Sequence, residues 1–257
     1  MVHSMARGQR VAAVLAGIGA FAGVAQGGIS DPGVVFTATN AQGTGSLSIP
    51  LAQGAPLPGG GWQWVLVGPP VNILGPGNVV LGTLTQASMT LRDTNVLAAS
   101  SFAVTAGQSN TTFTLNSALV TFGSITNAQA RASAGLTVTD NTGNGASVTG
   151  NRPGGAVFSA QYNGLAPAGS TFADLIAGPL VEPGGFGSES TNQSFPAAPG
   201  AFSAIAGSVG SVSTMWDFTV TANDQASGTS VFVLVPTPAS LALLGMSGLV
   251  LGGRRRA

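Results

Sequence analysis

Short runs of alternating apolar and polar residues, separated by Gly, Asn, Asp and Pro, fill the chain from residue 34 to residue 235. An alternation with a period of two is typical of β-strands that bury one face. The runs recur every 8 to 12 residues or so, which favours an antiparallel β-sandwich with either a jelly-roll or an immunoglobulin-like strand order. We therefore predict an all-β domain over residues 28–234. The predicted strands are 34–39, 46–49, 62–67, 79–90, 101–105, 111–122, 131–139, 146–149, 156–162, 211–221 and 229–235.

Two pairs of these runs have the pattern of hairpins. Residues 135–139 and 146–149 flank a segment rich in Asp, Asn and Gly, which favours a tight turn. Residues 216–221 and 230–234 flank a similar polar segment. If the second pair is a hairpin, the last strand runs almost directly into the C-terminal segment.

One stretch of the domain lacks a strand pattern. Residues 178–200 contain four prolines among glycines and serines, a composition that disfavours a regular central strand. We predict a long loop or linker there. The prolines are Pro179, Pro183, Pro196 and Pro199.

Residues 1–27 have the three parts of a secretory signal peptide. Arg7 and Arg10 precede an apolar run over 11–24, and the small residues Ala25 and Gly27 follow it. The run has no polar face and is too short to span a bilayer comfortably. We predict a signal helix that directs export through the Sec translocon and is then removed.

Residues 235–257 combine a proline motif, an apolar run and a basic end. The prolines end the preceding strand, the apolar run can enter lipid as a short transmembrane helix, and arginines stay on the cytoplasmic side. The run falls just short of the roughly 17 residues that a stable span needs. The parts are Val235, Pro236, Thr237 and Pro238, then 239–253, then Arg254, Arg255 and Arg256.

This order resembles the PEP-CTERM sorting signal of Gram-negative bacteria, in which a Val-Pro-Glu-Pro motif, a short transmembrane helix and terminal arginines are recognised by an exosortase. Val235, Pro236 and Pro238 match the motif, whereas Thr237 replaces the family's Glu, so recognition needs an enzyme that tolerates this position. The resemblance covers 235–257 only. It implies passage through the inner membrane and delivery to the cell surface or the extracellular matrix of a biofilm. A plain C-terminal membrane anchor is the alternative, and it needs no double proline.

Composition removes several classes of function. Charged residues make up 6% of the 257 residues, against about 25% in an ordinary domain. Between the two terminal segments, three arginines and eight acids give a net charge of −5, which argues against nucleic-acid binding. Cysteine is absent, and His3 precedes the apolar part of the signal, so the exported part lacks thiols and imidazoles for catalysis. We therefore predict a non-catalytic protein without a cofactor.

Two sets of residues could bind a ligand. Trp62 and Trp64 share one face of a strand, where they would stack on sugar rings if exposed or form core if buried, and core is favoured. Exposure would support a carbohydrate-binding or adhesive module that contacts extracellular polysaccharide. Asp140, Thr142 and Asn144 faintly resemble a calcium loop, but the last ligand position holds no carboxylate, so a plain turn is favoured.

Two further alternatives depend on which strands are neighbours. Threonine pairs at alternate positions would align their hydroxyls on one face, as in ice-binding proteins, although threonine is also an ordinary solvent-facing strand residue. A glycoside hydrolase would need two carboxyls within roughly 5 to 10 Å of each other. The pairs are Thr37/Thr39, Thr83/Thr85, Thr112/Thr114, Thr137/Thr139 and Thr219/Thr221, and the acids are Asp31, Asp93, Asp217 and Asp224.

Overall fold

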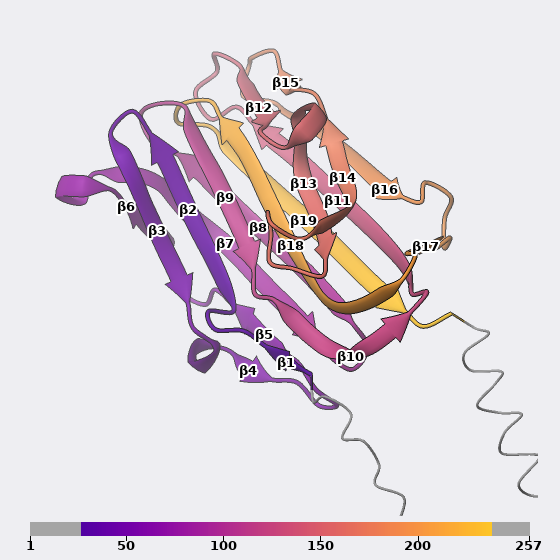
Figure 1. Cartoon of the computed structure of the whole chain (residues 1–257). Helices are drawn as coiled ribbons and strands as arrows, with labels where there is room; N and C mark the ends of the chain where they lie inside the picture. The colour runs from indigo at the N-terminus through magenta and orange to yellow at the C-terminus, as the bar shows by residue number, and fades with distance from the viewer. Residues whose placement is uncertain (1–26, 238–257) are drawn as a thin grey trace, which may run out of the picture.

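The computed structural model describes residues 27–237, which form a sandwich of two antiparallel β-sheets (Figure 1). The all-β prediction is confirmed. The predicted signal helix, except for Gly27, and the predicted transmembrane helix with its arginine tail lie outside the described residues. Within residues 27–237, no helix is long and apolar enough to cross a membrane. The helices there are the 3-10 turns η1 (Leu51–Gln53), η2 (Pro76–Asn78) and η3 (Pro153–Gly155).

The first sheet, sheet A, is built around β18 (Ser208–Val220). On one side β18 pairs with β9 (Thr111–Ser117) and β10 (Val120–Thr126), and on the other with β12 (Ala146–Gly150) and β13 (Ala156–Tyr162). The remaining strands of sheet A are β1 (Gly28–Ile29), β2 (Val34–Asn40), β3 (Gly43–Ile49), β14 (Ser170–Ala177) and β15 (Leu180–Glu182).

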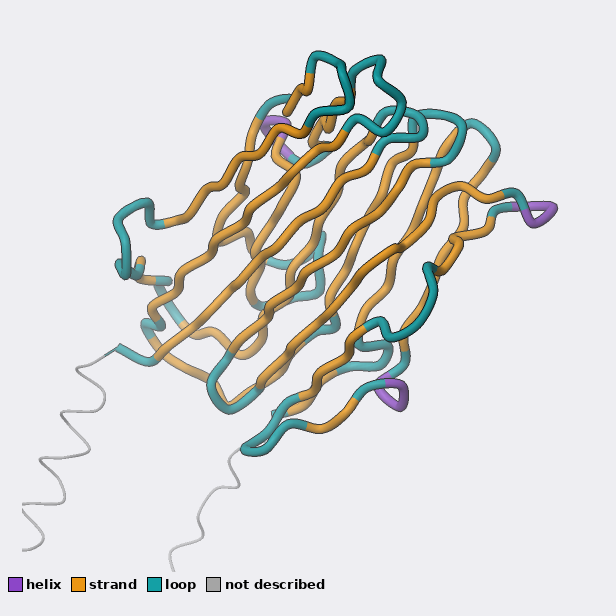
Figure 2. The backbone as a smooth tube through the Cα atoms, turned by 180° about the vertical axis from the view of Figure 1, so that it is seen from behind, coloured by secondary structure: helices purple, strands orange, loops and turns teal. Residues whose placement is uncertain are grey.

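The second sheet, sheet B, lies behind sheet A in Figure 1 and in front in Figure 2. Its last strand in sequence, β19 (Gln225–Val235), lies in the middle, between β8 (Leu97–Ala106) and β11 (Gln129–Thr139). The remaining strands of sheet B are β4 (Ala55–Pro56), β5 (Trp62–Val65), β6 (Val71–Leu74), β7 (Val80–Arg92), β16 (Ser188–Phe195) and β17 (Ser203–Ala204).

An aromatic cluster centred on Trp216 joins the sheets. Trp216 is fully buried on the inner face of sheet A, and its ring lies 5.0 Å from the ring of Phe102 in sheet B. Its indole N–H points to the hydroxyls of Ser100 (3.2 Å) and Ser230 (3.3 Å), which lie 2.8 Å from each other. Because both serines belong to sheet B, the buried indole sets how the two sheets face each other.

Both predicted hairpins are wrong, because the chain changes sheet at each turn. β11 lies in sheet B and pairs with β16 and β19, whereas β12 lies in sheet A. Likewise β18 lies in sheet A and β19 in sheet B. A polar turn between two alternating runs indicates that the chain reverses its direction. The same kinds of residue occur in a turn that joins two strands of one sheet and in a turn that carries the chain from one sheet to the other.

The predicted loop over 178–200 is also wrong, because it contains β15 and β16. β16 pairs through its whole length with β11, at the end of the strand order of sheet B. Pro183 and Pro196 lie just outside these two strands, where the lack of an N–H costs no ladder hydrogen bond. The side chains of β16 are nearly all exposed, so no apolar alternation marked it as a strand.

Residues 27 and 237 lie at the same end of the sandwich, here called the terminal end (Figures 1 and 2). The strand register is consistent with this placement. Val235, at the terminal end of β19, pairs with Gln129, and Gln225, at the other end of β19, pairs with Thr139. The opposite end, here called the distal end, carries the loops 140–145 and 221–224. Both ends of the described chain therefore leave the sandwich at the terminal end.

Replacing Trp216 with alanine should lower the free energy of unfolding by about 3 to 5 kcal/mol, since it removes the largest buried ring and leaves a cavity between the sheets. Urea unfolding followed by circular dichroism measures the change. Ser46→Ala, at an exposed position of β3, should change the stability by less than about 0.5 kcal/mol. Equal effects of the two substitutions would contradict the central role of the indole.

Candidate functional site

The motif that resembles a sorting signal begins where the central strand of sheet B ends. β19 stops at Val235, and Pro236, which has no N–H to extend the ladder, follows at once and is exposed. Thr237 is the last described residue, so Pro238 and Arg254 to Arg256 lie outside the described part. The motif thus starts at the terminal end with no spacer between it and the folded sheet.

The tryptophan pair does not form an exposed surface for sugar. Trp62 and Trp64 are 5% and 8% exposed, and both belong to the core. The Trp62 indole N–H donates to the Leu51 carbonyl at 2.8 Å, and its ring fills the space left by the missing side chain of Gly33. The favoured core assignment is confirmed, and a carbohydrate surface at these two residues is ruled out by their burial.

Asp140 organises the distal loop through its carboxylate. Its oxygens accept hydrogen bonds from the backbone N–H groups of Thr142, Gly143, Gly145 and Phe186. Burial alone would raise the pKa of this carboxyl, but the four N–H groups outweigh it and lower the pKa from 3.8 to about 2. The Thr142 hydroxyl lies 3.3 Å from an Asp140 oxygen and 2.5 Å from the Asn144 side-chain oxygen, so the three candidate ligands lie together. The carboxylate is nevertheless directed at backbone N–H donors, which is the arrangement of a turn.

The four acids considered for hydrolysis bond to separate segments. Asp31 accepts the Leu51 N–H at 2.7 Å, Asp217 accepts from the Asn151 amide at 3.0 Å, and Asp224 accepts from the Thr221 hydroxyl at 2.6 Å. Asp93 lies in the turn between β7 and β8. Among residues 27–237 the geometry therefore gives no support to a carboxyl pair drawn from these acids. The same residues hold no group of three metal-ligating side chains.

Three of the five threonine pairs lie on neighbouring strands of sheet A. The register there places one row of hydroxyls across five strands, and the hydroxyls of Thr112 and Thr219 lie 2.8 Å apart within it. In the next row the residue that pairs with Thr114 is Asp217, which is charged. The uncharged array of hydroxyls on sheet A is therefore only one row wide. The row consists of Thr44, Thr39, Thr112, Thr219 and Thr149.

A wider uncharged array lies on the outer face of sheet B, where β7, β8, β19, β11 and β16 run side by side (Figure 2). Residues that pair across these strands and point outward form rows, and four successive rows contain no charged residue. We call these four rows the neutral face. Arg92 and Arg131 occur only in the next row toward the terminal end. The first row is Thr83, Thr105, Gln225, Thr139 and Ser188, and the last is Thr90, Ala99, Val231, Ser133 and Ser194.

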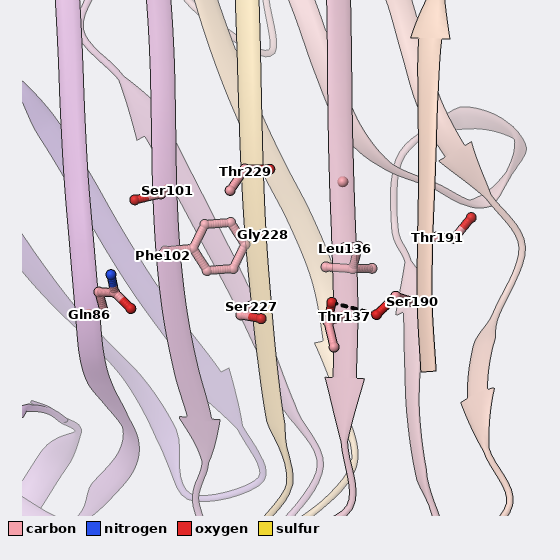
Figure 3. Close-up of a pocket in the computed structure, with 11 residues that line it drawn as sticks. Gln86, Ser101, Phe102, Leu136, Thr137, Ser190, Thr191, Ser227, Gly228 and Thr229 are labelled. Atoms are coloured by element: carbon pink, nitrogen blue, oxygen red, sulfur yellow. Dashed lines mark hydrogen bonds between the residues drawn. The ribbon is translucent and has the colours of Figure 1, made fainter. Parts of the chain in front are cut away.

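A hollow of about 330 Å³ lies in the middle of the neutral face, and Gly135 of β11, which has no side chain, lines it. Figure 3 shows Ser101, Ser227 and Thr229 among the side chains around the hollow. Thr229 and Asn192 are the cross-strand neighbours of Gly135, and a second hollow of about 230 Å³ lies on its other side. Hydroxyls of Ser227 and Thr229 line the larger hollow, and those of Thr137 and Ser190 are hydrogen-bonded to each other at 2.8 Å.

Sequence reasoning missed this site. In 131–139 the outward residues Ser133, Thr137 and Thr139 were visible as small polar residues, and Gly135 interrupts that series. These residues form one surface only because β11 pairs with β16 and with β19. The segment of β16 was predicted to be a loop, and no local pattern reveals the pairing of β11 with β19.

No family model matches the chain, and no curated protein matches it. Among solved structures, it is similar to the enzymatically active domain of tailspike protein 4 of bacteriophage CBA120, with 12% identity and a TM-score of 0.27, over 60% of this chain and 19% of that chain. It is also similar to infectious bursal disease virus Gt strain, with 14% identity and a TM-score of 0.15, over 98% of this chain and 69% of that chain. The chain thus spans about a fifth of the tailspike chain, and neither likeness is close enough to carry an argument.

Replacing Asp140 with asparagine should destabilise the sandwich at neutral pH, since one side of an amide is a donor and would face backbone N–H groups. Because the folded pKa lies below the unfolded one, the stabilisation from the carboxylate is complete above pH 4 or so and is lost as the pH falls toward 2. The urea midpoints of the two proteins should therefore converge over that range. A pH-independent difference would contradict this role.

Proposed function

We propose that this chain is an exported, non-catalytic protein of the cell surface or extracellular matrix, processed at a C-terminal PEP-CTERM-like signal. In this proposal residues 1–27 form a signal helix for the Sec translocon. Residues 239–253 form a short transmembrane helix that holds the protein in the inner membrane until an exosortase acts near Val235 to Pro238. The processed sandwich is then retained outside the cell.

The observation that carries the proposal is the position of the motif. β19 is a central strand that pairs with β11 as far as Val235 and with β8 as far as Val233, and Pro236 follows it exposed. A membrane-bound enzyme could reach this point without unfolding the sheet. Gly27, the first described residue, lies at the same terminal end (Figure 1). Both ends of the described chain can therefore face one membrane.

The distribution of charge supports the same orientation. At the terminal end, Asp31 and Asp93 are balanced by Arg92 and Arg131, so an anionic lipid surface would not repel it. The distal end is acidic and would be directed away from such a surface. The acids at the distal end are Asp140, Glu182, Glu189 and Asp224, and they outnumber Arg152, which lies toward the same end.

The proposal predicts that protein recovered from its native host lacks both terminal segments, and that Pro236→Ala with Pro238→Ala abolishes the C-terminal processing. The double variant should retain Arg254 to Arg256 and stay in the inner membrane, because the motif is lost while the apolar run is kept. Intact-mass measurement of membrane and extracellular fractions tests this.

Thr237→Glu serves as the control, because it restores the family's motif and should be processed at least as completely as the wild type. A wild-type mass that retains Arg254 to Arg256 in the inner membrane would leave only a tail-anchored sandwich. Processing that is indifferent to both prolines would point to an unrelated protease.

A further inference from the structure

We propose that the neutral face of sheet B binds a neutral polysaccharide, with the hollow at Gly135 as its centre. This deepens the proposed function, since extracellular polysaccharide is the partner that a matrix protein would meet. The binding itself does not depend on how the C-terminus is processed, so the two proposals can fail separately.

The first argument is the absence of charge. Charged residues make up 6% of this chain, so about one charged side chain would be expected among the twenty outward positions of the four rows. The four rows of the neutral face contain none, although Arg131 and Arg92 in the adjoining row show that the outer face of sheet B accepts charge. An uncharged surface matches an uncharged ligand and provides nothing to pair with the carboxylates or sulfates of an acidic one.

The second argument is the chemistry of the groups displayed. Serine and threonine hydroxyls and Gln and Asn amides both donate and accept hydrogen bonds, as the hydroxyls of sugars do. Ser227 and Thr229 present such groups on β19, and Gln86 and Ser101 extend the set to β7 and β8. Neighbouring strands lie about 4.7 to 4.9 Å apart, so a row provides regularly spaced partners for an extended chain.

The third argument is the shape. A volume of about 330 Å³ lies at the lower end of the range of about 300 to 1,000 Å³ for small-molecule sites. The hollow exists because Gly135 has no side chain between Thr229 and Asn192, and the second hollow continues on its far side. Together they form a shallow depression that a saccharide unit could enter while the rest of its chain lies across the rows.

The residues of the neutral face also determine how strongly it is expected to bind a polysaccharide. None of the outward positions of the neutral face is aromatic, and Phe102, which lines the hollow, is only 4% exposed. Stacking on sugar rings is therefore expected to contribute little. Each contact is expected to be weak, and retention in a matrix would come from many protein copies on one long polymer. Because no ion pair is formed, binding should not weaken as the salt concentration rises.

Gly135→Thr tests the site without breaking the fold. A Cβ at Gly135 would meet the Thr229 hydroxyl at 3.4 Å and the Thr191 carbonyl at 3.9 Å, which are ordinary contacts, and threonine suits a strand. The variant should therefore fold while its side chain fills the hollow. Gly210→Thr in β18 of sheet A is the matched control, because a Cβ there meets nothing within 4 Å.

The assay is affinity gel electrophoresis of protein purified from its host, through gels that contain dextran or the neutral or acidic fraction of the host's extracellular polysaccharide. The neutral fraction should retard the wild type and Gly210→Thr equally, at low and high salt, and the retardation should fall at least five-fold in Gly135→Thr. Circular dichroism confirms that all three proteins are folded.

Several results would overturn the proposal. These are retardation of Gly135→Thr equal to that of the wild type, retardation by the acidic fraction only, or no retardation in any gel. Concentration-dependent self-association that Gly135→Thr removes, without retardation, would assign the neutral face to a second copy of the chain instead. Polysaccharide binding by a chain that keeps its arginine tail would support this proposal while contradicting the processing proposal.

Discussion

The hydrogen bonds from the Trp216 indole to Ser100 and Ser230 fix the sandwich, because they are the buried polar contact at the centre of the aromatic cluster between its two sheets. A second buried bond, from the Thr111 hydroxyl to the Leu81 carbonyl at 3.0 Å, also joins the sheets. The chain has no cysteine, so no disulfide joins the sheets and core packing has to hold them. Apolar packing alone is weakly directional, whereas a buried N–H that must find its acceptor permits one relative position. Gly228 completes the arrangement, since a Cβ there would come within 2.6 Å of the Phe102 ring.

The functional surfaces follow from that arrangement. With Trp216 and Phe102 turned inward, the alternate residues of β8, β11 and β19 must face outward, and over the four rows of the neutral face they are uncharged. The same strand, β19, supplies a serine to the buried contact, hydroxyls to the neutral face, and the start of the proline motif at its end. The core, the candidate binding face and the exit of the chain therefore depend on one strand.

The sequence predicted what local patterns encode. Period-two alternation located most of the long strands, including β7, β11 and β18, and it favoured the burial of Trp62 and Trp64. It could not choose partners, because a strand that turns back beside its neighbour and one that crosses to the other sheet alternate in the same way. It also missed β16, whose exposed side chains do not alternate. The hollow at Gly135 arises only from the pairing of β11 with β16 and β19, so no single segment could reveal it.

The most direct test of the central claim, that the sandwich is displayed outside the cell, is antibody labelling of intact native-host cells. The antibody should be raised against the distal-end loop 140–145, which is expected to point away from the membrane. The account predicts labelling of intact cells or of their surrounding matrix, with little gain after permeabilisation. Labelling that appears only after the cells are permeabilised would contradict it.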